Sequence, residues 1–264
     1  MAVPLSPKTR RFAAWAVFGA GLLALGGVLL LLRFTIVTDY MYHRLVKDPE
    51  RIPPEGAVIV APADGTVLYV RRVEDGMIPE VVKQGVPVPL TQHLKTDPDK
   101  RFPDGILVGI YMAGDGVHVN RVPVSGMLVE QIVFNGPHMD MSATERTVLL
   151  TQLLPGWVRL KTWLGWPPYD LEDKADFILK SARETLVLRD VRGAHVYVVR
   201  IADYAVGKIL TWVRLGEQVA TGQRLGMIAG GSQTDIFIEH TPGLTPQARV
   251  GQYVYGGETI LATY

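Results

Sequence analysis

An uninterrupted apolar run near the N-terminus constrains the fold of this chain more than any other feature. Residues 12–32 (Phe12 to Leu32) carry no charge, and 21 such residues are enough to cross a hydrocarbon layer as a helix. A signal peptide has a shorter apolar core and a small-residue cleavage site, whereas this run ends in Leu29–Leu32, four leucines. We therefore expect residues 1–37 to be an uncleaved membrane anchor. Basic residues flank both of its ends, so charge does not decide its orientation.

The residues after this anchor divide into a short linker and one folded domain. Residues 38–55 are mostly polar and end in the proline-containing stretch Asp48–Pro54, which favours an extended backbone. From residue 56 onward, valine-rich runs alternate with glycine and proline, of which the chain has 27 and 18. Such spacing predicts many short strands joined by tight turns. We expect residues 56–264 to form a single, mainly β domain.

Two pairs of similar segments indicate that this β domain is internally duplicated. Pro62–Leu68 resembles Pro123–Val129, and Arg214–Gly222 resembles Arg249–Gly257. Both members of the second pair place a glycine three residues before a valine and another three residues after it. Internal similarity of this kind argues for one compact domain built from two related halves. The pattern resembles the duplicated half-barrels of lipoyl-type barrel-sandwich domains.

A tryptophan-rich segment interrupts the β pattern between residues 137 and 180. Trp157, Trp163 and Trp166 lie among leucines, and Leu171–Arg183 has the apolar spacing of a short amphipathic helix. This helical insertion makes the expected fold class α+β. Tryptophans next to basic residues are typical of a membrane interface. The alternative is an excursion that covers the core and buries its tryptophans, and the sequence leaves both interpretations open.

Composition excludes several classes of function. The net charge is only +1, so the chain lacks the basic field typical of nucleic-acid binders, and we expect no nucleic-acid partner. Cysteine is absent, which removes disulfides, thiolate metal sites and cysteine nucleophiles. The six histidines show no metal-ligand spacing to one another. We therefore expect no metal site.

The Gly231-Ser232 peptide bond is the strongest candidate for chemistry, although a Gly-Gly-Ser run alone is typical of a flexible turn. A serine hydroxyl lies close to the carbonyl before it and can attack that carbonyl once a base removes its proton. His118 and Asp64 supply an imidazole and a carboxylate. Each also has a purely structural interpretation, since Asp64-Gly65 is a hairpin signal. The Gly-x-Ser-x-Gly context of serine hydrolases is missing around Ser232.

Six segments of the chain, taken in order, resemble the pyruvoyl-dependent phosphatidylserine decarboxylase family, most closely its short bacterial type. The matching segments are Lys47–Arg51, Ala61–Gly65, Val117–Pro123, Val198–Ala202, Gly222–Ile228 and Gly231–Ser232. They extend over residues 46–264, and their shared order makes coincidence a poor explanation.

This resemblance implies that a precursor cuts itself at the Gly231-Ser232 bond into chains 1–231 and 232–264, which stay partners. Ser232 then becomes a covalent pyruvoyl group, a built-in pyruvate cofactor that acts as the electron sink for decarboxylation. The resemblance also implies that Asp64 and a histidine activate Ser232 during the cut. His118 is the residue expected to handle protons during turnover.

The resemblance further implies the substrate and the location. Phosphatidylserine would be converted to phosphatidylethanolamine and carbon dioxide in membrane phospholipid biosynthesis. The protein would sit in the bacterial inner membrane with its catalytic domain on the cytoplasmic face. The motifs concern headgroup chemistry alone, so they leave the lipid tail and backbone open, and a homo-oligomer is neither indicated nor excluded.

Two positions depart from the family pattern. Longer bacterial relatives carry a second histidine three residues after the first, where this chain has Arg121, which cannot act as a base. His118 would then serve both tasks, or processing would be slow. The family's Asn-Glu-Arg-Asn stretch is matched only loosely by Ala182–Thr185. Arg183, and after it Arg121, are the candidates to bind the substrate.

Two other functional classes are compatible with parts of the sequence. A membrane-anchored adaptor of the efflux type also joins one membrane span to lipoyl-like halves, but it carries long helical hairpins with heptads, which this sequence lacks. A pseudo-enzyme would keep the fold without the cut, and Arg121 is the one residue that favours it.

Overall fold

The computed structural model describes residues 7–45, 47–83, 86–113, 116–138, 140–154, 156, 160–161, 163–164, 166, 179–203, 208–228 and 232–264. The chain separates into two units, residues 1–44 and residues 45–264.

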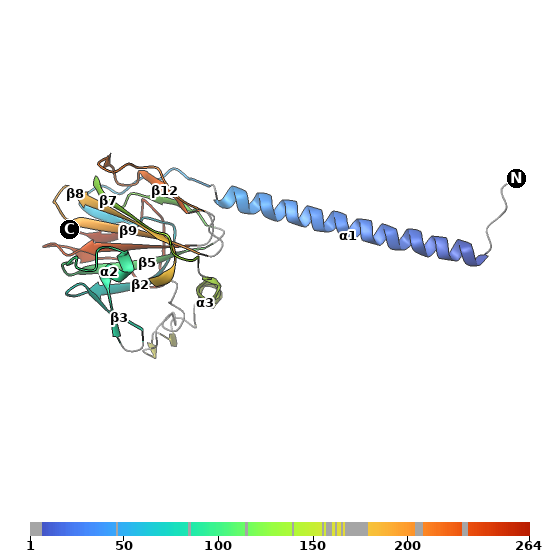
Figure 1. Ribbon diagram of the computed structural model, residues 1–264, viewed down its shortest axis with the longest axis horizontal. Helices are drawn as coiled ribbons and strands as arrows, with labels where there is room; N and C mark the ends of the chain where they lie inside the picture. Colours follow the sequence, from blue (N-terminus) through green and yellow to red (C-terminus); the bar gives the residue numbers. More distant parts are fainter. Residues whose placement is uncertain are drawn as a thin grey trace. The chain divides into compact units, whose positions relative to one another are not determined.

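The first unit is a single long helix, α1 (Pro7–Leu45), seen in Figure 1. Its apolar window, Trp15–Ile36, has 22 residues and a mean hydropathy of 2.3, and none of it is buried within the protein. At 1.5 Å per residue, such a window is about 33 Å long and can cross a bilayer. The helix continues to Leu45, so the first residues of the predicted linker, 38–45, are helical and not extended.

The second unit is built around an eight-stranded antiparallel sheet that curls on itself (Figure 1). In spatial order its strands are β11 (Gln218–Val219), β7 (Gly126–Phe134), β8 (Arg183–Asp190), β9 (His195–Ala202), β13 (Ser232–Glu239), β5 (Gly105–Met112), β2 (Gly65–Val73) and β15 (Tyr253–Val254). β13 pairs with β9 on one side and with β5 on the other along its whole length. It therefore lies in the interior of the sheet, with no free edge.

Among the described residues, the unit also has smaller sheets and the short helices α2 (Leu90–Leu94) and α3 (Ser142–Leu153). One sheet joins β1 (Val58–Val60), β16 (Ile260–Thr263) and β14 (Thr245–Pro246), a second joins β10 (Ile209–Thr211), β12 (Arg224–Ile228) and β6 (Val119–Arg121), and the third pairs β3 (Met77–Lys83) with β4 (Val86–Pro89). The unit is thus mainly β, as the sequence predicts.

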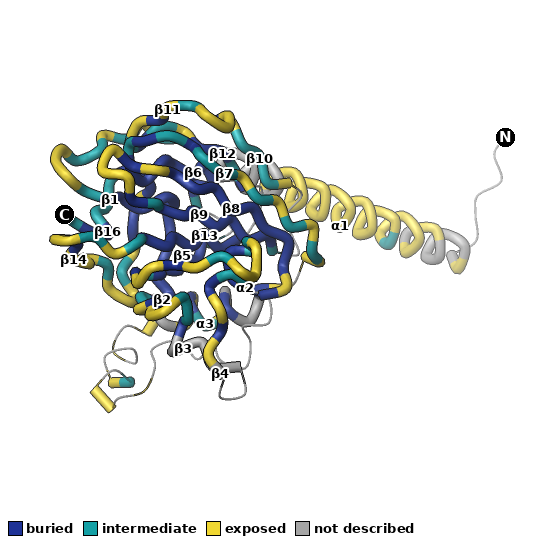
Figure 2. The backbone as a smooth tube through the Cα atoms, turned by 60° about the vertical axis from the view of Figure 1, so that its left-hand side comes forward, coloured by how far each residue is buried: buried dark blue, intermediate teal, exposed yellow. Residues whose placement is uncertain are grey.

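Both faces of the large sheet are buried, as the dark strands β5, β8, β9 and β13 in Figure 2 show. Along β13, Ile236 and Ile238 belong to one apolar cluster, together with residues of β1, β12 and β16. Phe237, which points the other way, belongs to a second cluster with α2 residues such as Leu90. A strand covered on both faces needs apolar side chains at successive positions, which explains the continuous run Ile236–Ile238.

The two internally similar segments make equivalent contacts at the two edges of the sheet. Val254 of β15 pairs with Gly65 of β2, and Val219 of β11 pairs with Gly126 of β7. The turns that precede β15 and β11 bind the sheet alike. The backbone N–H of Gly251 donates to Val67 O, and that of Gly216 donates to Leu128 O, each over 2.8 Å. Gly216 and Gly251 also share a positive φ, +83° and +82°, which explains why both segments need glycine at the same place.

The tryptophan-rich segment differs from its predicted helix. Residues 171–178 lie outside the described residues, and Arg183 begins strand β8 instead of ending a helix. The prediction is therefore wrong at Arg183 and untested over residues 171–178. Trp163 and Trp166 are 80% and 56% exposed, so the interpretation that buries them in the core is wrong for these two, and Trp157 lies outside the described residues.

We expect Gly216→Ala to lower the free energy of unfolding by about 1–2 kcal/mol, because Gly216 has φ +83°, which is strained for residues with a Cβ. No atom lies within 4 Å of the added methyl group, so the cost is purely conformational. Gly216→Asn should cost less, since asparagine tolerates this region better. Denaturant unfolding measures both variants, and equal effects of Ala and Asn would contradict the explanation.

Candidate active site

Ser232 is the first residue of β13 and is fully buried. Its neighbours across the sheet are Met112, the last residue of β5, and Ala202, the last residue of β9. The Ser232 hydroxyl lies 3.4 Å from Met112 Sδ. Gly231, the other half of the predicted cleavage bond, lies outside the described residues. The hydroxyl is thus held between apolar side chains at one end of the sheet.

His118 lies beside the strand that leads to this serine. Its backbone carbonyl accepts a hydrogen bond from the N–H of Ile228 (3.1 Å), four residues before Ser232. The ring Nδ1 is 2.9 Å from Gly116 O. A carbonyl only accepts, so Nδ1 carries the hydrogen, and Nε2 is then the basic nitrogen of the neutral ring.

Asn120 connects the same segment to the other side of the cleavage bond. Its Nδ2 donates to Thr234 Oγ1 over 3.2 Å, and Thr234 is two residues after Ser232. The same amide lies 3.7 Å from Met112 Sδ, the sulfur that the serine hydroxyl contacts. The segment from His118 to Asn120 therefore flanks the predicted cleavage bond on both sides.

In the structure, Asp64 contacts Arg51 and Gly256, and no hydrogen bond with Ser232 or His118 is seen among the described residues. Arg51 Nη2 donates to Asp64 Oδ2 (2.6 Å), and the backbone N–H of Gly256 donates to Oδ1 (2.7 Å). Burial raises the pKa of Asp64 above its ordinary value of 3.8, against the opposing effects of Gly256 and Arg51. Both carboxylate oxygens are thus engaged, and the role of Asp64 in activating Ser232 stays a prediction.

Arg121 holds the leading segment, residues 47–51, against the domain. Its guanidinium forms an ion pair with Asp48 and donates to Pro49 O (2.9 Å) and Gly222 O (3.2 Å). Arg224 also pairs with Asp48. The structure thus gives this arginine a role in joining the leading segment to β6 and β12.

Arg183 is buried on the face of the sheet opposite to the Ser232 side chain. Its Nη1 donates to His93 O (2.9 Å) and its Nε to Ser181 O (3.0 Å). Burial lowers the pKa of Arg183 to about 10, against the opposing charge of Asp235. The guanidinium therefore remains charged at neutral pH, and its binding of substrate stays a prediction.

A buried polar network on that same face was missed by sequence reasoning. Asp235 Oδ2 accepts from the Tyr69 hydroxyl (2.6 Å) and lies 2.8 Å from His93 Nε2. Gln233 Nε2 donates to Asp235 Oδ1 (2.7 Å) and to the Tyr69 oxygen (3.0 Å). The signal in the sequence is that two polar residues, Gln233 and Asp235, lie two positions apart at the start of an apolar strand. They therefore share one face, and once buried there both need polar partners.

Glycine makes this network sterically feasible. A Cβ at Gly109, the β5 residue paired with Asp235, would lie 2.4 Å from the Tyr69 ring. The missing side chain lets the ring lie across the sheet and brings its hydroxyl to Asp235. Burial raises the pKa of Tyr69 well above 10.0, and the Asp235 charge raises it further, so the phenol stays protonated and donates.

Among the described residues, no group of three or more His, Asp or Glu side chains is arranged to hold a metal ion.

Comparison with known proteins identifies the family. A sequence model described as phosphatidylserine decarboxylase matches residues 39–262. The chain belongs to the phosphatidylserine decarboxylase family. It is thus an enzyme of the carboxy-lyase class, and the serine at the start of β13 lies in a phosphatidylserine decarboxylase domain.

Relatives of this phosphatidylserine decarboxylase span nearly its full length. A protein of Methanocaldococcus jannaschii, provisionally named an archaetidylserine decarboxylase proenzyme, is 32% identical over 88% of this chain and 90% of its own. A phosphatidylserine decarboxylase proenzyme of Geotalea uraniireducens is 25% identical over 98% of this chain and 95% of its own. Another such proenzyme, from Nitratidesulfovibrio vulgaris, is 29% identical over 87% of this chain and 80% of its own. The word proenzyme in these names denotes a precursor that is processed.

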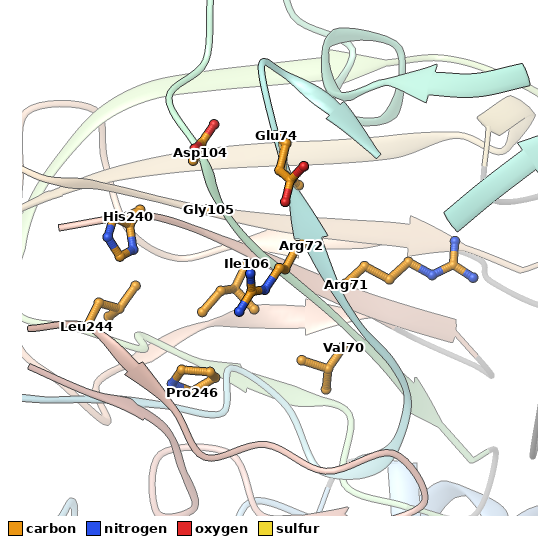
Figure 3. A pocket seen from close by; sticks show the side chains of 11 residues that line it. Val70, Arg71, Arg72, Glu74, Asp104, Gly105, Ile106, His240, Leu244 and Pro246 are labelled. Atoms are coloured by element: carbon orange, nitrogen blue, oxygen red, sulfur yellow. The ribbon is translucent and has the colours of Figure 1, made fainter. Parts of the chain in front are cut away.

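Cavities lie at both ends of this decarboxylase's sheet. One of about 560 Å³ is lined by Arg72, Glu74, Asp104 and His240 (Figure 3). It lies at the end of β13 opposite to Ser232, seven residues or about 24 Å away. A smaller one, of about 190 Å³, is lined by Ala202, the β9 neighbour of Ser232. Of the described cavities, the smaller one is thus the one with a residue paired to Ser232 in its lining.

We expect His93 to make stability depend on pH. Burial lowers the pKa of His93 below 6.5, against the opposing effect of Asp235, and Arg183 and Arg71 lower it further. The unfolded chain therefore binds a proton that the folded chain does not, and stability falls as the pH drops below about 6.5, by up to about 1.4 kcal/mol per pH unit.

Denaturant unfolding between pH 5 and 7.5 tests this expectation. His93→Gln, which cannot titrate, should show a shallower decline at low pH than the unsubstituted protein. His195→Gln, at a half-exposed histidine that contacts Glu239, serves as the control. Parallel curves for His93→Gln and the unsubstituted protein would refute the role of His93.

Proposed function

We propose that this chain is a self-cleaving, pyruvoyl-dependent decarboxylase that converts phosphatidylserine to phosphatidylethanolamine and carbon dioxide in membrane phospholipid biosynthesis. The observation that carries the proposal is the position of Ser232. It is buried at the start of a central strand, directly after Gly231, with His118 bonded to the strand that leads to it. Membership of the family and the proenzyme names of the relatives support it.

The cut follows from serine chemistry. The Ser232 oxygen attacks the Gly231 carbonyl carbon, and the peptide C–N bond breaks to give an ester and a free amine. Loss of the proton on Cα and of the ester oxygen releases residues 1–231 with a terminal carboxylate and leaves a dehydroalanine. Addition of water and loss of ammonia then leave a pyruvoyl group at the start of residues 232–264. That group supplies the carbonyl that accepts the electron pair left by departing carbon dioxide.

The residues around Ser232 fit such a group. Met112 and Ala202 flank it on the neighbouring strands, and their apolar side chains exclude water from the reacting atoms. His118 Nε2 is the proposed base for the hydroxyl and the proton donor during turnover. Asp64 is proposed to assist the cut. In support, the N–H of Arg121, in the strand that follows His118, donates to Pro62 O over 2.8 Å, beside the Asp64 turn.

The domain limits and fold type also remain proposals. We infer an anchor over residues 1–37, a linker over 38–55 and a decarboxylase domain over 56–264. The equivalent hydrogen bonds of Gly216 and Gly251 support a duplicated, lipoyl-like barrel-sandwich origin for the domain.

A surface of exposed apolar residues supports membrane contact by the catalytic domain. It consists of Leu149, Leu150, Leu154, Leu160, Trp163, Leu164 and Trp166. This tryptophan surface follows β7 in the chain, and the N–H of Met141, before α3, donates to Asp203 (2.9 Å), one residue after Ala202. We propose that it lies in the lipid interface near Ser232, on the cytoplasmic face of a bacterial inner membrane anchored by α1.

The proposed substrate is defined by its headgroup. The relatives' names include both archaetidylserine and phosphatidylserine decarboxylases, which share a serine phosphodiester and differ in lipid backbone. Phosphatidylserine is proposed here on the basis of the family model.

Ser232→Ala should abolish the cut. Intact-mass measurement of the unsubstituted protein should show two chains, residues 1–231 and 232–264, the smaller of 33 residues and blocked to Edman degradation. The variant should give one uncut chain without decarboxylase activity. Ser125→Ala, at a turn serine bonded to Thr221, is the matched control and should be cut normally. A single uncut chain from the unsubstituted protein would refute the proposal.

The tryptophan surface can be probed with single cysteines, because the chain has none of its own. A polarity-sensitive dye at Trp163→Cys should shift to the blue in phospholipid bilayers and be quenched by spin-labelled lipid. Val191→Cys, 87% exposed at the other end of β8, is the control and should do neither. The same response at both positions would argue against a membrane contact specific to this surface.

A further inference from the structure

The small cavity beside Ser232 has the position required of a headgroup pocket. Ala202 lines it, and Ala202 and Ser232 are directly paired across β9 and β13, which places their Cα atoms about 5 Å apart. Of the other described cavities, one lies at the far end of β13, and one lies between α2 and the end of β7, where Phe134 lines it as well. Its volume of about 190 Å³ equals about six waters, which suits a polar headgroup and leaves acyl chains outside.

The chemistry of a serine phospholipid fixes where its phosphate must lie. Four bonds of about 1.5 Å separate the serine nitrogen from the phosphorus, so the two atoms are at most about 5 Å apart. The nitrogen has to reach residue 232 for the proposed reaction. The phosphate therefore lies within one strand spacing of Ser232, which is the distance at which the cavity begins.

The cavity wall carries basic side chains, among them Arg183, whose guanidinium already donates to His93 O and Ser181 O. Lys208, just before β10, and His138, just after β7, are both exposed and both line it. Among the residues that the structure describes, Lys208 has no carboxylate partner within ion-pair distance. The acidic residue of the lining, Glu184, is already paired with Arg200 and accepts from Thr211 (2.7 Å). The wall is therefore positively charged toward an incoming anion.

We propose that Lys208, assisted by His138, binds the phosphodiester of the substrate in this cavity and so makes the enzyme specific for serine phosphodiesters over free serine. This inference rests on the proposed function. An ammonium group suits a phosphate because it offers three donors as a compact charge. The carboxylate that leaves is then free to face Ala202, the apolar residue of the lining that is paired with Ser232.

The test compares two soluble substrates on the full-length, self-cleaved enzyme in detergent. Glycerophosphoserine carries the phosphodiester, and O-methylserine has the same amine and carboxylate without it. Lys208→Ala should lower kcat/KM for glycerophosphoserine about 10- to 100-fold, mainly through KM, and leave that for O-methylserine unchanged. Lys208→Arg should restore most of the loss, and His138→Gln should cause a smaller one. Self-cleavage, which needs no lipid, should be complete in all variants.

Arg72→Ala is the matched control, since Arg72 is an exposed cation that lines the larger cavity at the far end of the sheet. It should leave both substrates unaffected. Equal losses for the two substrates in Lys208→Ala, no loss for either, or a loss of the same size in Arg72→Ala would each overturn the assignment of Lys208. Absence of cutting and decarboxylation in the unsubstituted protein would instead overturn the proposed function.

Discussion

The structure depends on the position of β13 between β5 and β9, to which it is hydrogen-bonded along its whole length. A strand without a free edge has every backbone group satisfied by its neighbours, so its first residue is held as firmly as its last. Ser232 is that first residue. The cut proposed before it would leave the new chain end inside the sheet, aligned by Met112 and Ala202.

The end of the sheet that carries Ser232 is also the end where the elements proposed to contact lipid join the strands. β5, β7 and β9 end there, and β8 and β13 begin there. The connection that follows β7 carries the tryptophan surface, and the segment before β10 carries Lys208. One end of the sheet therefore combines a buried serine, a small cavity and exposed apolar residues, while the larger cavity of Figure 3 lies at the opposite end.

Much of this arrangement was predictable from local patterns. The β class, the apolar N-terminal helix and the family follow from glycine spacing, hydropathy and six ordered motifs. The buried network was not predictable, because Tyr69 and Asp235 are 166 residues apart and meet only through sheet pairing. Arg183 was placed at the end of a predicted helix, but it begins β8, since apolar spacing gives the ends of elements poorly. The contacts of Asp64 with Arg51 and Gly256 likewise depend on long-range pairing.

The central place of β13 bears on how long one enzyme molecule can work. An enzyme that binds a diffusible cofactor can lose it and be reloaded. In this protein the proposed cofactor is the end of a strand whose partners on both sides belong to the other chain, so exchange would require the whole sheet to come apart. Each molecule therefore makes its reactive group once. Chemical damage to that group would retire the molecule, and the cell would restore activity only by synthesis of a new precursor.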